Sequence, residues 1–224
     1  MSLSPNFGPR RDGAAISLVV LHFTGMESHA AARARLCDPD AEVSAHYLIS
    51  ETGLCEALVA EDQRAWHAGQ GRWGDVSDVN SASIGIELTN DGAQPFAEPQ
   101  MAALTGLLGE VLTRYDLGPE AVIGHSDMAP HRKFDPGPRF DWRRLAREGV
   151  SVWPDMQDAD PSAFGEAAAR FGYPVDLVSN EDLLDAVRLR FRPWAAGPLD
   201  EFDSGLVADL AERYPCPGAS ALTG

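Results

Sequence analysis

The residues best suited to chemistry in this 224-residue chain lie in segment 121–138, where a proline-rich loop follows a short apolar run. His125 stands at the end of that run, and the loop carries Asp135 and Lys133, the only lysine among 18 basic residues. Zinc takes histidine nitrogen and carboxylate oxygen as ligands, and a catalytic zinc site keeps one position for water. The ten-residue separation of His125 and Asp135 suits a loop that folds back. This segment therefore predicts a hydrolytic metal site.

His22 is the third candidate ligand, because it lies near the end of the apolar run Ile16–Phe23. The ends of neighbouring strands can meet at one edge of a sheet, where sites tend to form. A lone histidine of this kind is more often a satisfied, half-buried residue, but His22, His125 and Asp135 together favour a Zn²⁺ site. His131 could compete as a ligand, although its proline and arginine neighbours indicate an exposed loop position.

Glu87 introduces a charge into the apolar run Ile84–Leu88. Burying an ionised carboxylate is costly unless the group has a partner or a function. Glu87 therefore either points outward from an edge position or acts as a general base that takes a proton from the attacking water. Lys133 is then either a surface cation or the donor that stabilises an oxyanion. Asp127 could support a ligand or cap a turn.

Five further residues are candidates for contact with a substrate: His46, Tyr47, Trp66, His67 and Arg132. His46 and Tyr47 follow a loop, and His67 lies in the sequence WHAG. These positions fit the protein core and a substrate-facing wall equally well. Arg132 adds positive charge beside the lone lysine, which an acidic protein needs locally in order to attract an anionic substrate.

These residues need a scaffold, and the hydrophobic pattern predicts one in which strands and helices alternate. Continuous β-branched runs are typical of strands covered on both faces. One longer run repeats apolar residues at helical spacing and has a proline near its start. We expect an α/β fold with a mixed central β-sheet flanked by helices. The expected strands are 16–23, 46–50, 54–59, 84–88 and 121–124, with 46–59 forming a hairpin, and the expected helices are 28–36, 99–115 and 141–147.

The chain changes character at the polar, proline-bounded linker Pro154–Pro161. From Asp155 onward it has 13 acidic and only 5 basic residues. Three short helical patterns follow the linker, so we expect a small three-helix C-terminal domain. The predicted division is a catalytic domain of residues 1–154 and a helical domain of residues 155–224. The three patterns span residues 162–171, 180–191 and 203–214.

The overall composition excludes some classes of partner and bounds the compartment. A net charge of −16 argues against nucleic acid and anionic membranes, because phosphate binding needs clustered basic residues. No apolar run is long enough to span a bilayer. Three widely spaced cysteines (Cys37, Cys55 and Cys216) suggest idle free thiols and mildly favour a reducing compartment. We expect a cytoplasmic protein, with export as the alternative if a leader has been removed.

Five ordered segments give the chain a specific resemblance over roughly residues 5–153. VVLHFTG, VSAHYLIS, AWHAG, SIGIEL and IGHSDMAPHRKFDPG resemble the zinc-dependent N-acetylmuramoyl-L-alanine amidases of the type 2 amidase and peptidoglycan-recognition-protein fold. The resemblance implies zinc ligands at His22, His125 and Asp135. It also implies a catalytic glutamate at Glu87 and an oxyanion-stabilising lysine at Lys133. The tail resembles, more loosely, a three-helix peptidoglycan-binding-like domain.

The resemblance implies cleavage of the amide between the lactyl group of N-acetylmuramic acid and the L-alanine of a stem peptide. The chain is similar to the amidases that recycle 1,6-anhydro-muropeptides, so we expect peptidoglycan fragments as its partners in cell-wall recycling or turnover. A non-catalytic peptidoglycan-recognition protein is the alternative, but such proteins lack a complete ligand set. A zinc peptidase of another fold would usually carry HExxH on a helix, and the chain has no such sequence.

Overall fold

A mixed five-stranded β-sheet forms the centre of the computed structural model, which describes residues 3–216. β2 (Leu18–Phe23) lies between β6 (Ser83–Leu88) and β7 (Val122–Gly124) and is parallel to both. β6 also pairs in parallel with β3 (Tyr47–Ile49), and β3 forms the predicted antiparallel hairpin with β4 (Cys55–Ala57). The expected mixed sheet is confirmed, and its order is β4-β3-β6-β2-β7.

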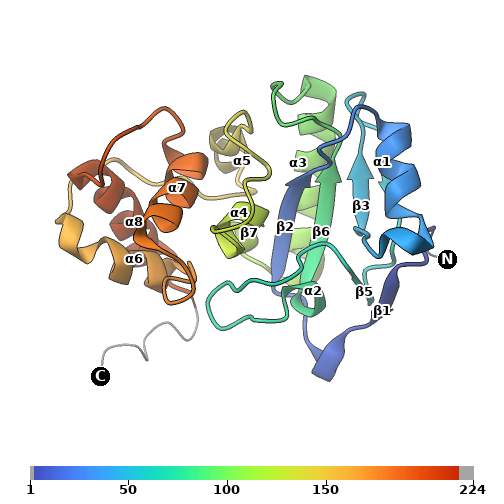
Figure 1. Cartoon of the computed structure of the whole chain (residues 1–224), viewed down its shortest axis with the longest axis horizontal. Helices are drawn as coiled ribbons and strands as arrows, with labels where there is room; N and C mark the ends of the chain where they lie inside the picture. Colours follow the sequence, from blue (N-terminus) through green and yellow to red (C-terminus); the bar gives the residue numbers. More distant parts are fainter. Residues whose placement is uncertain (1–2, 217–224) are drawn as a thin grey trace.

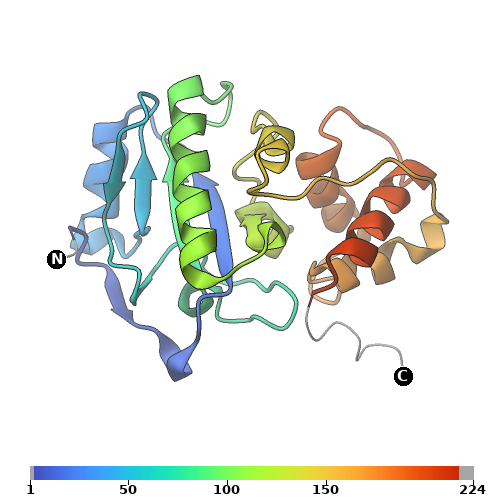
Figure 2. The same ribbon diagram turned by 180° about the vertical axis from the view of Figure 1, so that it is seen from behind.

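The two inner strands are apolar on both faces because both faces are covered. Val19 and Leu21 of β2 belong to the same buried cluster as Leu104 and Leu108 of α3 (Glu98–Tyr115). This long helix crosses one face of the sheet (Figure 2), and it has a proline in its first turn, as the sequence predicts. Alternate residues of β2 point to the opposite face. That face carries His22, so the sheet positions the site on the side away from α3.

Shorter elements complete the first part of the chain. Ser28 caps α1 (His29–Leu36) by accepting a hydrogen bond from the amide of Ala31, and Asp141 caps α5 (Trp142–Arg147) in the same way. The sequence did not predict the two-stranded sheet of β1 (Phe7–Pro9) and β5 (Gln63–Ala65), α2 (Val79–Ala82), α4 (His125–Met128) or the 3₁₀ turns Arg11–Gly13, Pro39–Ala41, Pro119–Ala121 and Pro161–Ala163. Each spans only three or four residues, which is too short for hydrophobic periodicity to reveal.

Three helices follow the linker, as the sequence predicts: α6 (Phe164–Phe171), α7 (Asn180–Phe191) and α8 (Glu201–Arg213). They lie together beyond α4 and α5, on the β7 side of the sheet (Figure 1). One buried cluster joins Val20 of β2 to Phe171 and Phe191 of these helices, so packing is continuous between the two parts of the chain. The division at residue 154 stays a prediction, and residues 217–224 of the predicted domain lie outside the described part.

The described residues contain no helix that is both long enough and apolar enough to cross a membrane. The three cysteines are free, with Cys37 and Cys216 half-buried and Cys55 exposed.

Candidate active site

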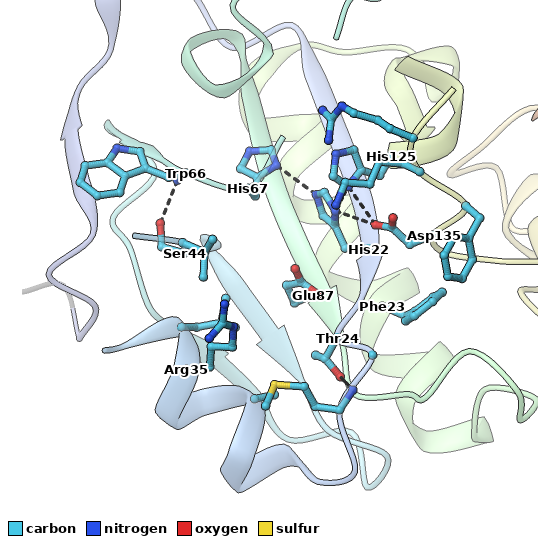
Figure 3. Close-up of a pocket in the computed structure, with 18 residues that line it drawn as sticks. His22, Phe23, Thr24, Arg35, Ser44, Trp66, His67, Glu87, His125 and Asp135 are labelled. Atoms are coloured by element: carbon cyan, nitrogen blue, oxygen red, sulfur yellow. Dashed lines mark hydrogen bonds and ion pairs between the residues drawn. The ribbon is translucent and has the colours of Figure 1, made fainter. Parts of the chain in front are cut away.

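Three predicted metal ligands meet at the carboxyl edge of the sheet. His22 lies in β2, His125 directly follows the neighbouring parallel strand β7, and the loop after α4 returns Asp135 to the same place. The Nδ1 atoms of His22 and His125 lie 2.9 Å apart, and Asp135 Oδ2 lies 2.9 Å from the first and 3.0 Å from the second. All three residues are buried, and their side chains point toward one another (Figure 3). The predicted grouping of the three residues is therefore present.

Hydrogen bonds to the far side of each imidazole leave both Nδ1 atoms free to act as ligands. His125 Nε2 donates to the carbonyl oxygen of Ala68 at 2.8 Å, so its Nδ1 carries the lone pair. His22 Nε2 lies 3.0 Å from His67 Nδ1, and His67 Nε2 lies 3.1 Å from the Ser83 hydroxyl. Because that hydroxyl donates to the carbonyl of Val79, it accepts from His67 Nε2, and His67 Nδ1 accepts from His22 Nε2. The Nδ1 atom of His22 therefore keeps its lone pair.

The charges of the three residues match the needs of a cation. Burial, with the neighbouring His125, lowers the pKa of His22 to about 4, so its imidazole is neutral at physiological pH. The two neighbouring histidine side chains hold the pKa of Asp135 well below its usual value despite burial, so its carboxylate stays ionised. Two imidazole nitrogens and one carboxylate oxygen within 3.0 Å of one another can all be reached by one cation with bonds of about 2.0–2.2 Å. These residues fit a metal ion.

Glu87 lies beside this group. In the register of the sheet it pairs with His22, so both side chains project from the same face. β6 is an inner strand, which excludes the alternative that Glu87 occupies an edge position. Its Oε2 atom is buried and has no hydrogen-bond partner among the described residues. A buried carboxylate oxygen without a partner is rare in structural positions and is expected where a reacting group will sit.

Burial, together with the negative charge of Asp135, raises the pKa of Glu87 to about 8 in the metal-free protein. Below pH 4.5 the carboxyl group of Glu87 is protonated in both the folded and the unfolded chain, so its ionisation does not change the free energy of unfolding. Between pH 4.5 and 8 only the unfolded chain ionises readily, so metal-free wild-type protein loses stability as the pH rises. Glu87→Gln should therefore stabilise the metal-free protein at pH 8.5, by on the order of 1.4 kcal/mol for each unit by which the pKa is raised, and have little effect at pH 4.5. Urea unfolding at the two pH values measures this, and equal differences at both would contradict it.

Gly85 provides the space for His67. A Cβ atom at residue 85 would lie 2.4–2.6 Å from three atoms of the His67 ring, closer than packing allows. The ring can therefore contact the strand and reach His22 only because residue 85 has no side chain. This explains the glycine within an otherwise apolar strand.

Gly85→Ala should displace His67 and release the hydrogen bond that orients His22. We expect a loss of stability of about 1–3 kcal/mol from overpacking and a fall in catalytic rate of about tenfold or more from the misplaced ligand. Gly106→Ala on α3 is the matched control, because a Cβ at residue 106 meets no atom within 4 Å. Thermal unfolding and initial rates of both variants are the measurements, and an active, fully stable Gly85→Ala protein would refute the packing argument.

A cavity of about 360 Å³ opens over the metal ligands and Glu87. Of the residues predicted to contact substrate, Trp66, His67 and Arg132 line it, and Lys133 lines it too. Arg132 is anchored by donating through Nε to the carbonyl of Gln70 at 2.9 Å. The cavity also has lining residues that the sequence did not single out: Phe23, Thr24, Gly25, Met26, Ala32, Arg35, Leu36, Val43, Ser44 and Phe134.

Arg35 is the most informative of the missed residues. It comes from α1 and faces the cavity across from the metal ligands (Figure 3). Its neighbour Arg33 pairs with Glu56, whereas Arg35 has no ion-pair partner among the described residues. Both arginines read as solvated helix charges in the sequence HAAARARL, so only the fold distinguishes them.

His46 and Tyr47 lie outside the cavity. His46 is buried and accepts the amide of Gly85 at 2.9 Å, while its other nitrogen lies 3.1 Å from the carbonyl of Gln63. Tyr47 donates its hydroxyl to Glu61 at 2.7 Å. These contacts favour the alternative of core positions over the predicted substrate wall. His131 is exposed, as its neighbours indicate, and is absent from the metal-ligand group.

Comparison with known proteins gives a consistent result. The model of the N-acetylmuramoyl-L-alanine amidase family matches residues 12–138. N-acetylmuramoyl-L-alanine amidase AmiD of Escherichia coli is 34% identical over 89% of this chain and 83% of its own. The 1,6-anhydro-N-acetylmuramyl-L-alanine amidase AmpD of Haemophilus influenzae is 32% identical over 63% of this chain and 86% of its own.

Two solved structures are similar along nearly the whole chain. AmiD of E. coli, in complex with the substrate anhydro-N-acetylmuramic acid-L-Ala-D-γ-Glu-L-Lys, superimposes with a TM-score of 0.82 at 32% identity, covering 92% of this chain and 91% of that one. AmpDh3 of Pseudomonas aeruginosa, in complex with anhydromuramic pentapeptide, gives a TM-score of 0.79 at 30% identity, covering 96% and 97%.

Proposed function

This chain belongs to the N-acetylmuramoyl-L-alanine amidase family, and on that footing we propose that it hydrolyses the amide between 1,6-anhydro-N-acetylmuramic acid and the L-alanine of a stem peptide. The observation that carries the proposal is a carboxylate with one buried, unpartnered oxygen beside a His-His-Asp group in a cavity. The similarity of the whole fold to two amidases solved with anhydromuramyl peptides supports the anhydro sugar.

The proposed cofactor is a zinc ion held by His22, His125 and Asp135. When bound, zinc supplies a Lewis acid that makes water a nucleophile at neutral pH and polarises the scissile carbonyl. His67 and the carbonyl of Ala68 keep the two imidazoles oriented with Nδ1 toward the site. Ligands fixed in this way need little rearrangement during catalysis.

Glu87 and Lys133 are proposed to move and stabilise charge. Glu87, through its unpartnered Oε2, accepts a proton from the attacking water and later returns it to the departing alanine nitrogen. A pKa raised by burial suits this exchange, because the group must hold the proton between the two steps. Lys133 lines the same cavity and donates to the oxyanion that forms when water adds to the carbonyl.

Cations around the cavity are proposed to bind the substrate. Arg35 and Arg132 face the cavity in a protein whose net charge is −16, so they concentrate positive charge where an anionic peptide must enter. Guanidinium groups suit carboxylates because they can donate two parallel hydrogen bonds. Trp66 provides an apolar part of the cavity wall.

Muropeptide hydrolysis followed by mass spectrometry tests the function. Metal-free, zinc-restored and Glu87→Ala proteins are incubated with 1,6-anhydro-muropeptide and with intact sacculi. We expect zinc-dependent release of free stem peptide, faster from the anhydro substrate and absent in the variant. Binding of muropeptide without release by the zinc-restored protein would instead support a recognition protein. Fractionation of cells that make the native protein tests the proposed cytoplasmic location against export.

A further inference from the structure

The C-terminal helices place a buried cation against the segment that holds a metal ligand. Arg190 of α7 is 2% exposed, and its Nη1 donates to Asp127 Oδ2 at 2.6 Å. Asp127 is fully buried and lies in α4, two residues after His125. The contact therefore joins α7 directly to the helix that begins with this ligand.

Asp127 receives hydrogen bonds from three separate parts of the chain. Besides Arg190, its Oδ2 accepts the amide of Gly124 at 2.7 Å, and its Oδ1 accepts the hydroxyl of Tyr173 at 2.9 Å. The hydrogen bond from Gly124 caps the first turn of α4, so Asp127 has the turn-capping role that the sequence suggested as one of two. Tyr173 and Arg190 both lie beyond the linker, and together they hold the carboxylate that fixes the start of α4.

Arg190 also contacts the strand that leads into His125. Its Nη2 donates to the carbonyl of Val122 at 3.0 Å. Val122 is the first residue of β7, which is an edge strand of the sheet. The guanidinium lies 4.2 Å from the centre of the Trp142 ring, which covers it. One side chain from α7 thus donates hydrogen bonds both to the strand that precedes His125 and to the helix that begins with it.

We propose that Arg190 is a positioning residue for His125 and that the C-terminal helices brace the metal site. This inference rests on the proposed function for the identity of the metal as zinc. Removing Arg190 would leave the Asp127 charge buried with no cation, which forces that carboxylate to move away from its present position. The start of α4 would then loosen, and the Nδ1 atom of His125 would lose its fixed position. Groups that orient metal ligands in this way typically change metal affinity by about 10–100-fold.

The same helix offers a matched control. Arg188 is also buried on α7, but its Nε donates to Asp203 of α8 at 3.1–3.2 Å, within the C-terminal helices. Arg188→Met therefore breaks a buried Arg–Asp pair on the same helix without touching α4, and Asp203 keeps its second ion pair, with Arg192. It measures the purely structural cost of losing such a pair.

Zinc affinity and backbone exchange in the full chain test the proposal. The zinc dissociation constant is measured by competition with a chromophoric chelator, well below the unfolding temperature of each variant. Amide hydrogen exchange over residues 125–129 is measured in the metal-free protein. We expect Arg190→Met to bind zinc about tenfold more weakly and to exchange faster. Arg190→Lys should recover part of both losses, and Tyr173→Phe should shift both slightly in the same direction.

Arg188→Met should lower the unfolding temperature and leave both readouts unchanged. Wild-type affinity and exchange in Arg190→Met would overturn the proposal, as would an equal change in Arg188→Met. If Arg190→Met does not fold, Arg190→Lys and Tyr173→Phe decide the question by the same two measurements. Neither readout uses muropeptide, so a failure of the wild-type protein to hydrolyse it would be a separate result.

Discussion

Glu87→Gln is expected to lower kcat by about a thousandfold, because general acid–base catalysis typically contributes 10²–10⁴-fold. Glutamine has nearly the same shape but cannot take a proton from water or return one to the alanine nitrogen. The metal ligands keep their own contacts in this variant, since no hydrogen bond joins them to Glu87 in the described structure. Zinc content should therefore stay near one per chain and KM near its wild-type value. Steady-state kinetics with metal analysis of the same samples gives all three quantities.

Glu56→Gln is the matched control for this experiment. Glu56 is a half-buried carboxylate of the same sheet, but it faces α1, where it pairs with His29 and Arg33. Its loss should lower stability only slightly, because partly exposed ion pairs contribute little to the free energy of folding. The value of kcat should stay within about twofold of wild type, because Glu56 does not line the cavity. A Glu87→Gln enzyme with wild-type kcat would remove Glu87 from the mechanism.

Asp135→Asn is expected to abolish hydrolysis by weakening metal binding about a hundredfold or more. The amide oxygen lacks the negative charge that a divalent cation gains from a carboxylate, and two neutral imidazoles alone make an incomplete site. Excess zinc in the assay should restore only part of the rate. Chelator competition gives the affinity, and the zinc dependence of the initial rate gives the partial rescue.

Asp200→Asn controls for the loss of a carboxylate elsewhere in the chain. Asp200 caps α8 and pairs with Arg192, away from the cavity. This variant should keep wild-type zinc affinity even if α8 is weakened. Tight zinc binding by Asp135→Asn would show that the metal uses other ligands.

The metal group was predictable because its signals are local. Strand-length apolar runs end near His22 and His125, and parallel neighbours bring such ends together. Asp135 could be placed with them because the loop after His125 is long enough to fold back to the same edge of the sheet. Glu87 was visible as a charge inside a buried strand, although only the strand order showed that β6 is an inner strand.

Residues that act through distant partners could not be predicted in the same way. Arg35 and Arg33 look alike in sequence, and only the position of α1 directs one to the cavity and the other to Glu56. Arg190 contacts a carboxylate 63 residues away, and no periodicity encodes that pairing. His46 was equally compatible with core and cavity until its contacts with Gly85 and Gln63 were known.

The contact of Arg190 with β7 also bears on how an edge of the sheet is protected. β7 is a terminal strand, and terminal strands with free carbonyls and apolar side chains can recruit strands from other molecules. In the described structure Arg190 of α7 donates to the Val122 carbonyl of this edge strand, and α7 contacts α4, which follows β7. A fragment ending at residue 154 would present the border uncovered, along with the apolar surface that Phe171 and Phe191 bury. Arg190 thus covers part of a sheet edge that could otherwise pair with a strand of another molecule.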